Sequence, residues 1–196
     1  MTHYYTDNAD LASSPKVFGY YFNDEHFTFT TDIGVFSKEN VDYGSYVLIK
    51  NALRFPLGQQ IMDLGCGYGP VGIIIKRFLP DAEVTMIDVN SRAVELAAKN
   101  CILNHTENTV CLCEDILSLK NTFNSIILNP PIRAGKSLIY GLYEKSFKKL
   151  ADGGSLFIVI QKKHGAESSY KKLKELFKEV SLVDRAGGYQ VYRAVK

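Results

Sequence analysis

From residue 60 onward, short runs of apolar and β-branched residues alternate with longer segments that have helical periodicity. Such alternation is typical of parallel strands joined by crossover helices, so it predicts an α/β fold. We expect strands at residues 60–64, 83–88, 109–114, 125–129, 155–160, 180–183 and 190–195, with a turn at Gly187-Gly188 joining the last two as a hairpin. The pattern predicts a seven-stranded, mostly parallel sheet with one antiparallel strand and helices on both faces.

The segment between the second and third expected strands has the clearest helical pattern. Asn90 or Ser91 stands where the N-cap of this helix belongs. Two further helices are expected at residues 136–150 and 167–177. One stripe of the first helix has the spacing i, i+3, i+4, i+7, i+8 and is expected to pack on the sheet: Val94, Ala97, Ala98, Cys101 and Ile102.

Before residue 60 the pattern is less regular. Residues 20–31 predict a hairpin with a turn near Asn23-Asp24, and residues 42–54 predict a helix. A chain of 196 residues is within the range of one compact domain. We therefore interpret residues 1–196 as a single domain, in which residues 1–55 cap the sheet and residues 56–196 form the core that carries the functional site.

A glycine-rich loop, Asp63-Leu64-Gly65-Cys66-Gly67-Tyr68-Gly69, follows the first expected strand. In an open parallel sheet, ligands bind beyond the carboxyl ends of the strands, and glycine lets the backbone approach them closely. The dinucleotide-binding pattern Gly-x-Gly-x-x-Gly fails when it is counted from the first glycine but is met when it is counted from the second. The loop alone therefore leaves a nicotinamide dinucleotide open. The acid before it favours a ligand with a charged amino end, so the candidate cofactor contacts are Asp63, Gly65, Cys66 and Gly67.

Two further acids follow the second and third expected strands. Asp88 stands where a carboxylate can accept hydrogen bonds from both hydroxyls of a ribose, which indicates a cofactor that contains adenosine. Asp115 can accept from the amino group of an adenine, with Val89 and Ile116 as apolar walls on the two ring faces. An N-cap or turn role for Asp115 remains an alternative.

The tetrapeptide Asn129-Pro130-Pro131-Ile132 follows the fourth expected strand. The exocyclic amine of a base is a poor nucleophile because its lone pair is delocalised into the ring. The side-chain oxygen of Asn129 and the backbone oxygen of Pro130 can each accept one N–H, which directs the lone pair toward a methyl donor. The prolines fix the backbone and add no competing donor. In isolation the tetrapeptide fits a turn, but after a glycine loop and two acids it predicts methyl transfer to nitrogen.

The net charge of +2 conceals an asymmetry. Residues 1–132 carry 9 Lys and Arg against 15 Asp and Glu, whereas residues 133–196 carry 14 against 6. The basic part begins directly after the tetrapeptide, so an anionic polymer would be attracted toward the mouth of the expected site.

Membrane and metal proteins are disfavoured. No segment approaches the ~20 consecutive apolar residues of a membrane span, and the N-terminus is polar and acidic, so we expect a cytoplasmic protein with no membrane contact. The four cysteines form no Cys-x-x-Cys pair and have no histidine cluster nearby, so we expect neither a metal site nor a disulfide framework.

These motifs together resemble a known family, the small-subunit ribosomal RNA guanine-N2 methyltransferases of the RsmC type, within the class I superfamily that uses S-adenosylmethionine. The resemblance covers residues 17–196. It implies a Rossmann-like class I methyltransferase fold, S-adenosylmethionine as cofactor, cofactor contacts at residues 65, 67, 88 and 115, and catalysis at Asn129. The motifs that carry it are 32–37 (DIGVFS), 63–69, Asp88, Asp115, 129–136 (NPPIRAGK), 161–166 (QKKHGA) and 187–189 (GGY).

One position departs from related amino methyltransferases. Many of them end the tetrapeptide with Tyr or Phe, which stacks on the flipped base, whereas this chain has Ile132. Phe36 is a candidate replacement for this stacking residue. The second, inactive copy of the fold found in longer relatives has no room in 196 residues. A base must leave its duplex to be modified, and the phosphates beside it are expected to meet Arg133, Lys136, Lys162 and Lys163.

We therefore expect an RNA methyltransferase with ribosomal RNA or the small ribosomal subunit as partner, and a homodimer remains open. Adenine N6 and a protein glutamine are alternatives to guanine N2 as the methyl acceptor, because Asn-Pro-Pro suits all three. A non-catalytic RNA-binding module that retains the cofactor pocket is a second alternative, and a nicotinamide-dependent dehydrogenase is a more distant third.

Overall fold

The computed structural model describes residues 13–35, 37, 39–106 and 109–196. Its elements, in chain order, are Lys16–Phe22 (β1), Glu25–Thr31 (β2), Tyr43–Ala52 (α1), Gln60–Leu64 (β3), Pro70–Phe78 (α2), Glu83–Ile87 (β4), Ser91–Leu103 (α3), Val110–Leu112 (β5), Ile116–Ser118 (η1), Phe123–Leu128 (β6), Ile132–Ala134 (η2), Lys136–Lys149 (α4), Leu150–Gln161 (β7), Lys162–His164 (η3), Ala166–Leu176 (α5), Glu179–Ala186 (β8) and Tyr189–Val195 (β9).

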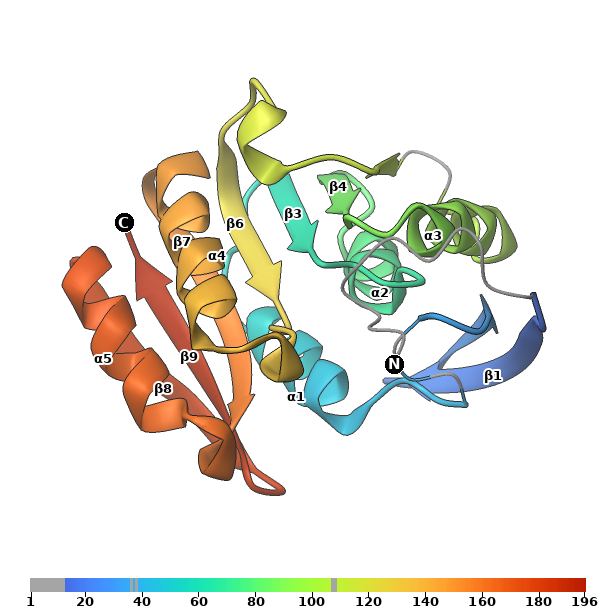
Figure 1. Cartoon of the computed structure of the whole chain (residues 1–196). Coiled ribbons are helices and arrows are strands. Elements are labelled where there is room, and N and C mark those ends of the chain that lie inside the picture. The colour runs from blue at the N-terminus through green and yellow to red at the C-terminus, as the bar shows by residue number, and fades with distance from the viewer. Residues whose placement is uncertain (1–12, 36, 38, 107–108) are drawn as a thin grey trace.

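The main sheet has seven strands in the order β5-β4-β3-β6-β7-β9-β8 (Figure 1). Strand β9 runs antiparallel to both of its neighbours, and every other pair is parallel. The predicted sheet, with one antiparallel strand, is therefore confirmed. The last two strands form the expected hairpin at Gly187 and Gly188, both of which have positive φ, and β9 lies between β7 and β8.

Helices cover both faces of the sheet, as predicted. Helices α1, α2 and α3 contribute to one buried apolar cluster, whereas α4 and α5 pack against the other face (Figure 1). Strand β6 lies at the centre, where Ile126, Ile127 and Leu128 are fully buried. A strand covered on both faces needs a continuous apolar run rather than alternation, and this is the run that precedes Asn129.

The N-terminal hairpin forms, but it does not lie on the main sheet. β1 and β2 pair as a separate two-stranded sheet, and β1 begins at Lys16, four residues before the predicted start. The turn is where the sequence predicts it, because Asn23 and Asp24 both have positive φ, as a two-residue type I′ turn requires. The hairpin packs against α3, and Phe22, Phe27 and Phe29 are buried beneath it.

Helix α3 begins after Asn90, as expected, but its buried face differs from the predicted one. Ile102 is 63% exposed and Ala98 is also exposed, whereas Leu96, Ala97, Asn100 and Cys101 are buried. Asn100 and Asn104 exchange hydrogen bonds with the backbone N–H and C=O groups of Thr30 and Thr28 in β2. The helix therefore turns a polar stripe inward, because its amides pair with the open edge of the hairpin.

The boundary between α4 and β7 also differs from the prediction. The helix ends at Lys149 and β7 begins at Leu150, five residues before the expected start of the strand. Gly153 and Gly154 lie within β7, near a shift in its pairing register with β6. Within the described part of the chain, no helix is long and apolar enough to span a membrane.

Candidate active site

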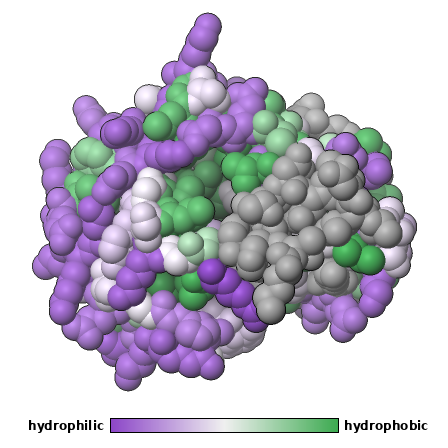
Figure 2. Space-filling model, viewed as in Figure 1, coloured by the Kyte–Doolittle hydropathy of each residue, from purple (hydrophilic) through white to green (hydrophobic). Residues whose placement is uncertain are grey.

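A cavity of about 370 Å³ opens beyond the carboxyl ends of β3, β4 and β6. Figure 2 shows hydrophobic residues at the floor of a hollow on this face of the molecule. All nine residues that the sequence predicts as cofactor contacts line this cavity: Asp63, Gly65, Cys66, Gly67, Asp88, Val89, Asp115, Ile116 and Asn129. Pro130 and Pro131 line it as well. The topology explains this gathering, because β3, β4 and β6 are adjacent and parallel.

The glycine loop leaves its inner surface open. Gly65 and Gly67 have φ angles of +74° and +56°, and apart from the adjoining residues no atom of the described chain lies within 4 Å of the place where a Cβ would stand on either residue. Positive φ disfavours other residues there, and the missing side chains leave room for a ligand against the backbone. The loop is attached to β4, because the N–H groups of Gly65 and Cys66 donate to the carbonyl of Ile87.

Asp63 lies behind the loop at the end of β3. Its side chain is buried, and Oδ2 accepts a hydrogen bond of 2.8 Å from the backbone N–H of Gly72 in α2. The pKa of Asp63 is raised to about 7: burial is the main cause, the nearby carboxylate of Asp88 adds to the shift, and the bond from Gly72 opposes it. A cationic group in the cavity would favour the ionised form.

Asp88 stands at the end of β4 and connects two loops. Oδ2 accepts from the N–H of Gly67 and Oδ1 accepts from the N–H of Asn90, each at 2.9 Å. Burial raises the pKa of this carboxyl group, and the backbone donors limit the shift. A carboxylate has about four acceptor sites, so Asp88 can still accept from a ribose hydroxyl.

Asp115 adopts the alternative role that the sequence left open. It is the N-cap of η1, with Oδ1 accepting from the N–H of Leu117 at 2.8 Å, and Oδ2 pairs with Lys145 of α4. The lysine holds the pKa of Asp115 below its usual value. The carboxylate still lines the cavity beside Ile116, which is buried, and Val89, which is 55% exposed. The predicted adenine contact would therefore share this carboxylate with Lys145, a residue that sequence reasoning missed.

Asn129 contacts two residues of the N-terminal segment. Its Nδ2 donates to Oδ2 of Asp42 at 3.2 Å and to Oγ of Ser45 at 3.0 Å. Both partners line the cavity, and sequence reasoning missed both. The available signal was the helix start itself, because Asp42 is the N-cap of α1 and Ser45 stands three residues later.

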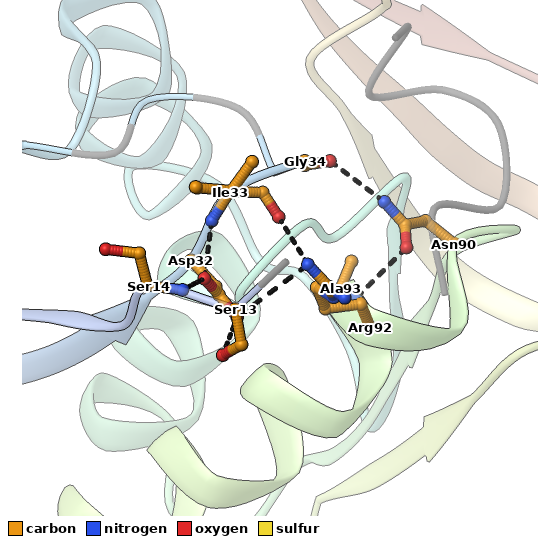
Figure 3. Close-up of polar contacts among 8 residues, drawn as sticks. All are labelled: Ser13, Ser14, Asp32, Ile33, Gly34, Asn90, Arg92 and Ala93. Carbon is orange, nitrogen blue, oxygen red and sulfur yellow. Dashed lines mark hydrogen bonds and ion pairs between the residues drawn. The ribbon is translucent and has the colours of Figure 1, made fainter. Parts of the chain in front are cut away.

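A strap formed by residues 32–35, together with Ser37, borders the cavity, with Val35 and Ser37 among the lining residues. Figure 3 shows how the start of α3 holds this strap. Nδ2 of Asn90 donates to the carbonyl of Gly34, and Arg92 donates to the carbonyl of Ile33 and forms an ion pair with Asp32 (Figure 3). The strap is thereby connected to the residues that follow Asp88.

None of the four predicted RNA contacts lines the cavity. Arg133 belongs to η2, Lys136 begins α4, and Lys162 and Lys163 form η3 directly after β7. All four are exposed, and none forms an ion pair with another described residue. Lys136 lies close to the segment that carries Lys162 and Lys163. Its Cε is 4.0 Å from the place where a Cβ would stand on Gly165, the residue that follows η3.

The structure does not bring the last residue of the tetrapeptide to the cavity. Ile132 is half-buried, packs against the apolar cluster beneath α4 and α5, and is not among the lining residues. Phe36 lies outside the described residues. The stacking role of Phe36 therefore stays a prediction.

Comparison with known proteins agrees with the geometry. The chain matches the methyltransferase small domain family over residues 26–193. It is 43% identical to the uncharacterized protein YbxB of Bacillus subtilis (strain 168), across 99% of this chain and 98% of that protein. It is 29% identical to ribosomal RNA small subunit methyltransferase C of Haemophilus influenzae (strain PittGG), across 86% of this chain and 51% of that enzyme. The chain thus spans about half the length of this methyltransferase C relative.

Among solved structures, the chain is similar to the T. thermophilus 16S rRNA N2 G1207 methyltransferase (RsmC) in complex with AdoMet and guanosine. The TM-score is 0.84 and the identity is 26%, across 95% of this chain and 52% of that one. The predicted class I fold and the cofactor S-adenosylmethionine are confirmed by this comparison, and the open glycine loop beside Asp88 fits such a ligand. The chain is an S-adenosylmethionine-dependent methyltransferase and belongs to the methyltransferase small domain family.

Proposed function

We propose that this enzyme methylates the exocyclic N2 of a guanine in small-subunit ribosomal RNA. The observation that carries the proposal is the orientation of Asn129. Its amide nitrogen is occupied by Asp42 and Ser45, and no other described residue donates to its Oδ1. The amide oxygen is therefore available to a substrate N–H in the cavity that also holds the glycine loop. The methyltransferase C relatives and the RsmC structure support guanine N2 in ribosomal RNA as the acceptor.

The cofactor site consists of the glycine loop and its acids. Gly65 and Gly67 would expose backbone to the ligand, Asp88 would accept from the ribose hydroxyls, and Asp63 would lie beside the amino end of the methionine part. Val89 and Ile116 would enclose the adenine, and Asp115 would accept from its amino group. The bound cofactor supplies a methyl group on a sulfonium cation, an activated carbon whose leaving group is neutral.

The chain contributes orientation to the reaction. Oδ1 of Asn129 and the carbonyl oxygen of Pro130 each accept one N–H of the guanine amine, so that the nitrogen lone pair faces the methyl donor. Positive charge develops on the amine as the bond forms, and the two oxygens stabilise it. Neither Pro130 nor Pro131 has an N–H, so no backbone donor competes for the substrate nitrogen. No side chain has to remove a proton before the transfer.

The cations around the cavity would hold the RNA. A base within a duplex cannot reach Asn129, so the target is single-stranded or extruded at a cost of a few kcal/mol. Arg133 and Lys136 follow the tetrapeptide in η2 and at the start of α4, and Lys162 and Lys163 follow β7. Because these exposed cations have no ion-pair partner among the described residues, they are available to phosphates next to the extruded base.

Nucleoside mass spectrometry of ribosomal RNA tests the proposal. We expect N2-methylguanosine at one position to disappear when the gene is deleted, to return with the wild-type protein, and to stay absent with Asn129→Ala, which retains cofactor binding. Purified enzyme would then be assayed in parallel on small subunits, naked ribosomal RNA and a protein with an accessible glutamine. Loss of an N6-methyladenosine instead, or methylation of only the protein, would contradict the proposal.

A further inference from the structure

Helix α1 begins next to the tetrapeptide, although the two segments are far apart in sequence. Asp42 is the N-cap of this helix: Oδ1 accepts from the N–H of Gly44 at 2.9 Å and Oδ2 from the N–H of Ser45 at 3.3 Å. The hydroxyl of Ser45 also donates to Oδ2. Asn129 completes the cluster with its two bonds from Nδ2.

The polarity of this cluster is fixed by its members. A carboxylate can only accept hydrogen bonds, and the proton of the Ser45 hydroxyl is already directed to Asp42, so Oγ accepts from Asn129. Both hydrogens of Nδ2 thus have acceptors on the α1 side. If the amide were rotated by 180°, its oxygen would face a carboxylate and a hydroxyl oxygen whose hydrogen is already used, so this orientation is excluded.

We propose that Asp42 and Ser45 are positioning residues for methyl transfer, which direct Oδ1 of Asn129 toward the substrate nitrogen. The inference rests on the proposed function of Asn129. The two residues also polarise the amide, because acceptors on Nδ2 increase the negative charge on Oδ1 and strengthen its bond to the amine. The carboxylate of Asp42, which is hydrogen-bonded to the Asn129 amide, further stabilises the positive charge that develops on the amine.

Helix capping alone does not require this arrangement. Asn and Ser cap helices about as well as Asp, so any of them at residue 42 would satisfy the first turn of α1. Contact with a side chain 87 residues away adds nothing to the cap. Both Asp42 and Ser45 also line the cavity, where a purely structural cap has no need to be.

The variant Ser45→Ala isolates the positioning role, because it removes one acceptor from Asn129 and leaves the Asp42 cap in place. We expect kcat to fall about tenfold to a hundredfold, as for a slightly misdirected catalytic group, while the Kd for S-adenosylmethionine and the unfolding midpoint stay close to wild type. Ser45→Thr keeps the hydroxyl and restores kcat to within a few-fold. In the Asn129→Asp background, Ser45→Ala should have much less effect, since the bond that it removes is already absent.

A swap of donor and acceptor tests the pair directly. Asp42→Asn keeps the cap but directs an amide N–H at the Nδ2 of Asn129, and Asn129→Asp directs a carboxylate at Asp42. Each single variant should have a lower kcat than the wild type. The double variant Asp42→Asn with Asn129→Asp recreates one donor and one acceptor, so its kcat should be higher than that of either single variant. Unchanged kcat in Asp42→Asn, or losses that simply multiply in the double variant, would overturn the inference.

A spectroscopic readout separates this inference from the proposed function. In ¹⁵N spectra, the side-chain amide protons of Asn129 should exchange slowly with water in the wild-type protein and faster in Ser45→Ala, whichever acceptor the enzyme uses. A wild-type enzyme that methylates another acceptor would contradict the proposed function alone. The opposite result would contradict the positioning role alone. In that case the wild-type enzyme would methylate guanine, and Ser45→Ala would leave both the Asn129 amide signal and kcat unchanged.

Discussion

The carboxylate of Asp63 and the backbone N–H of Gly72 form a buried hydrogen bond of 2.8 Å between β3 and α2. A Cβ on Gly72 would lie 2.5 Å from the side chain of Met86, so the helix reaches this distance only because residue 72 has no side chain. The bond places an acid of raised pKa at the inner end of the cofactor cavity. The cavity is therefore expected to respond to pH.

We expect the affinity for S-adenosylmethionine to increase with pH up to about 7. Below its pKa of about 7, Asp63 is protonated in the free protein, and the ammonium of the cofactor favours the ionised form, so binding releases a proton. The Kd should fall by up to about tenfold per pH unit below pH 7 and level off above it. Calorimetry from pH 5.5 to 8 in buffers of different ionisation enthalpy measures both effects. Asp63→Asn should bind more weakly, with little pH dependence; an unchanged slope would assign the effect to Asp88.

The same acid affects the stability of the free protein. Its folded pKa of about 7 lies above the ordinary value of 3.8, so the folded state binds the proton more tightly than the unfolded chain. The stabilisation is complete below about pH 4 and is lost as pH rises through 7. Urea unfolding without cofactor should show this decline for the wild type and a smaller decline for Asp63→Asn. Equal declines in both proteins would show that Asp63 is not responsible.

Replacing Asp88 should weaken cofactor binding. Asp88→Ala removes the ribose acceptor and also the anchor of the Gly67 N–H. Hydrogen bonds to a charged group contribute about 1.5–3 kcal/mol, so the Kd should rise about tenfold to a hundredfold or more. Ser45→Ala is the matched control, since Ser45 lines the same cavity and this variant should leave the Kd close to wild type. Similar losses in both variants would contradict the separate roles of cofactor site and acceptor site.

Reversing the charge of the η3 lysines should weaken RNA binding and leave cofactor binding unchanged. For Lys162→Glu with Lys163→Glu, the slope of log K against log salt should flatten by about 0.7–0.9 for each phosphate contact that is lost. Lys148→Glu with Lys178→Glu is the control of equal charge, because these exposed lysines lie near the starts of β7 and β8, away from the cavity. Equal effects of the two pairs would indicate unspecific attraction by net charge.

The buried asparagines of α3 should contribute strongly to stability. Asn100 bonds to both backbone groups of Thr30 and to the carbonyl of Tyr68 in the glycine loop. Asn100→Ala leaves these groups without partners, at a cost of about 2 kcal/mol or more. Urea unfolding should show this loss, while the exposed Lys99→Ala stays within about 0.5 kcal/mol of wild type. A small loss for Asn100→Ala would mean that the hairpin can repack on α3.

Local patterns were sufficient to predict the architecture. Runs such as the one before Asn129 are apolar because β6 is covered on both faces, and glycine is needed at residues 65 and 67 because of their positive φ. Once the strands are parallel, Asp63, Asp88 and Asn129 must meet at one edge of the sheet. The sequence therefore determined the fold class, the place of the cavity and most of the residues around it.

Contacts between distant segments were decided only by the tertiary structure. Periodicity states which side chains share a helix face but not which element that face meets, so the inward stripe of α3 with Asn100 could not be anticipated. From the sequence, Asp42 is an ordinary helix cap. Its contact with Asn129 exists only because α1 packs beside β7 in the folded protein. Likewise, Lys145 reaches Asp115 only because α4 crosses over η1. The orientation of the Asn129 amide thus depends on a hydrogen bond whose partners lie 87 residues apart, which no local pattern contains.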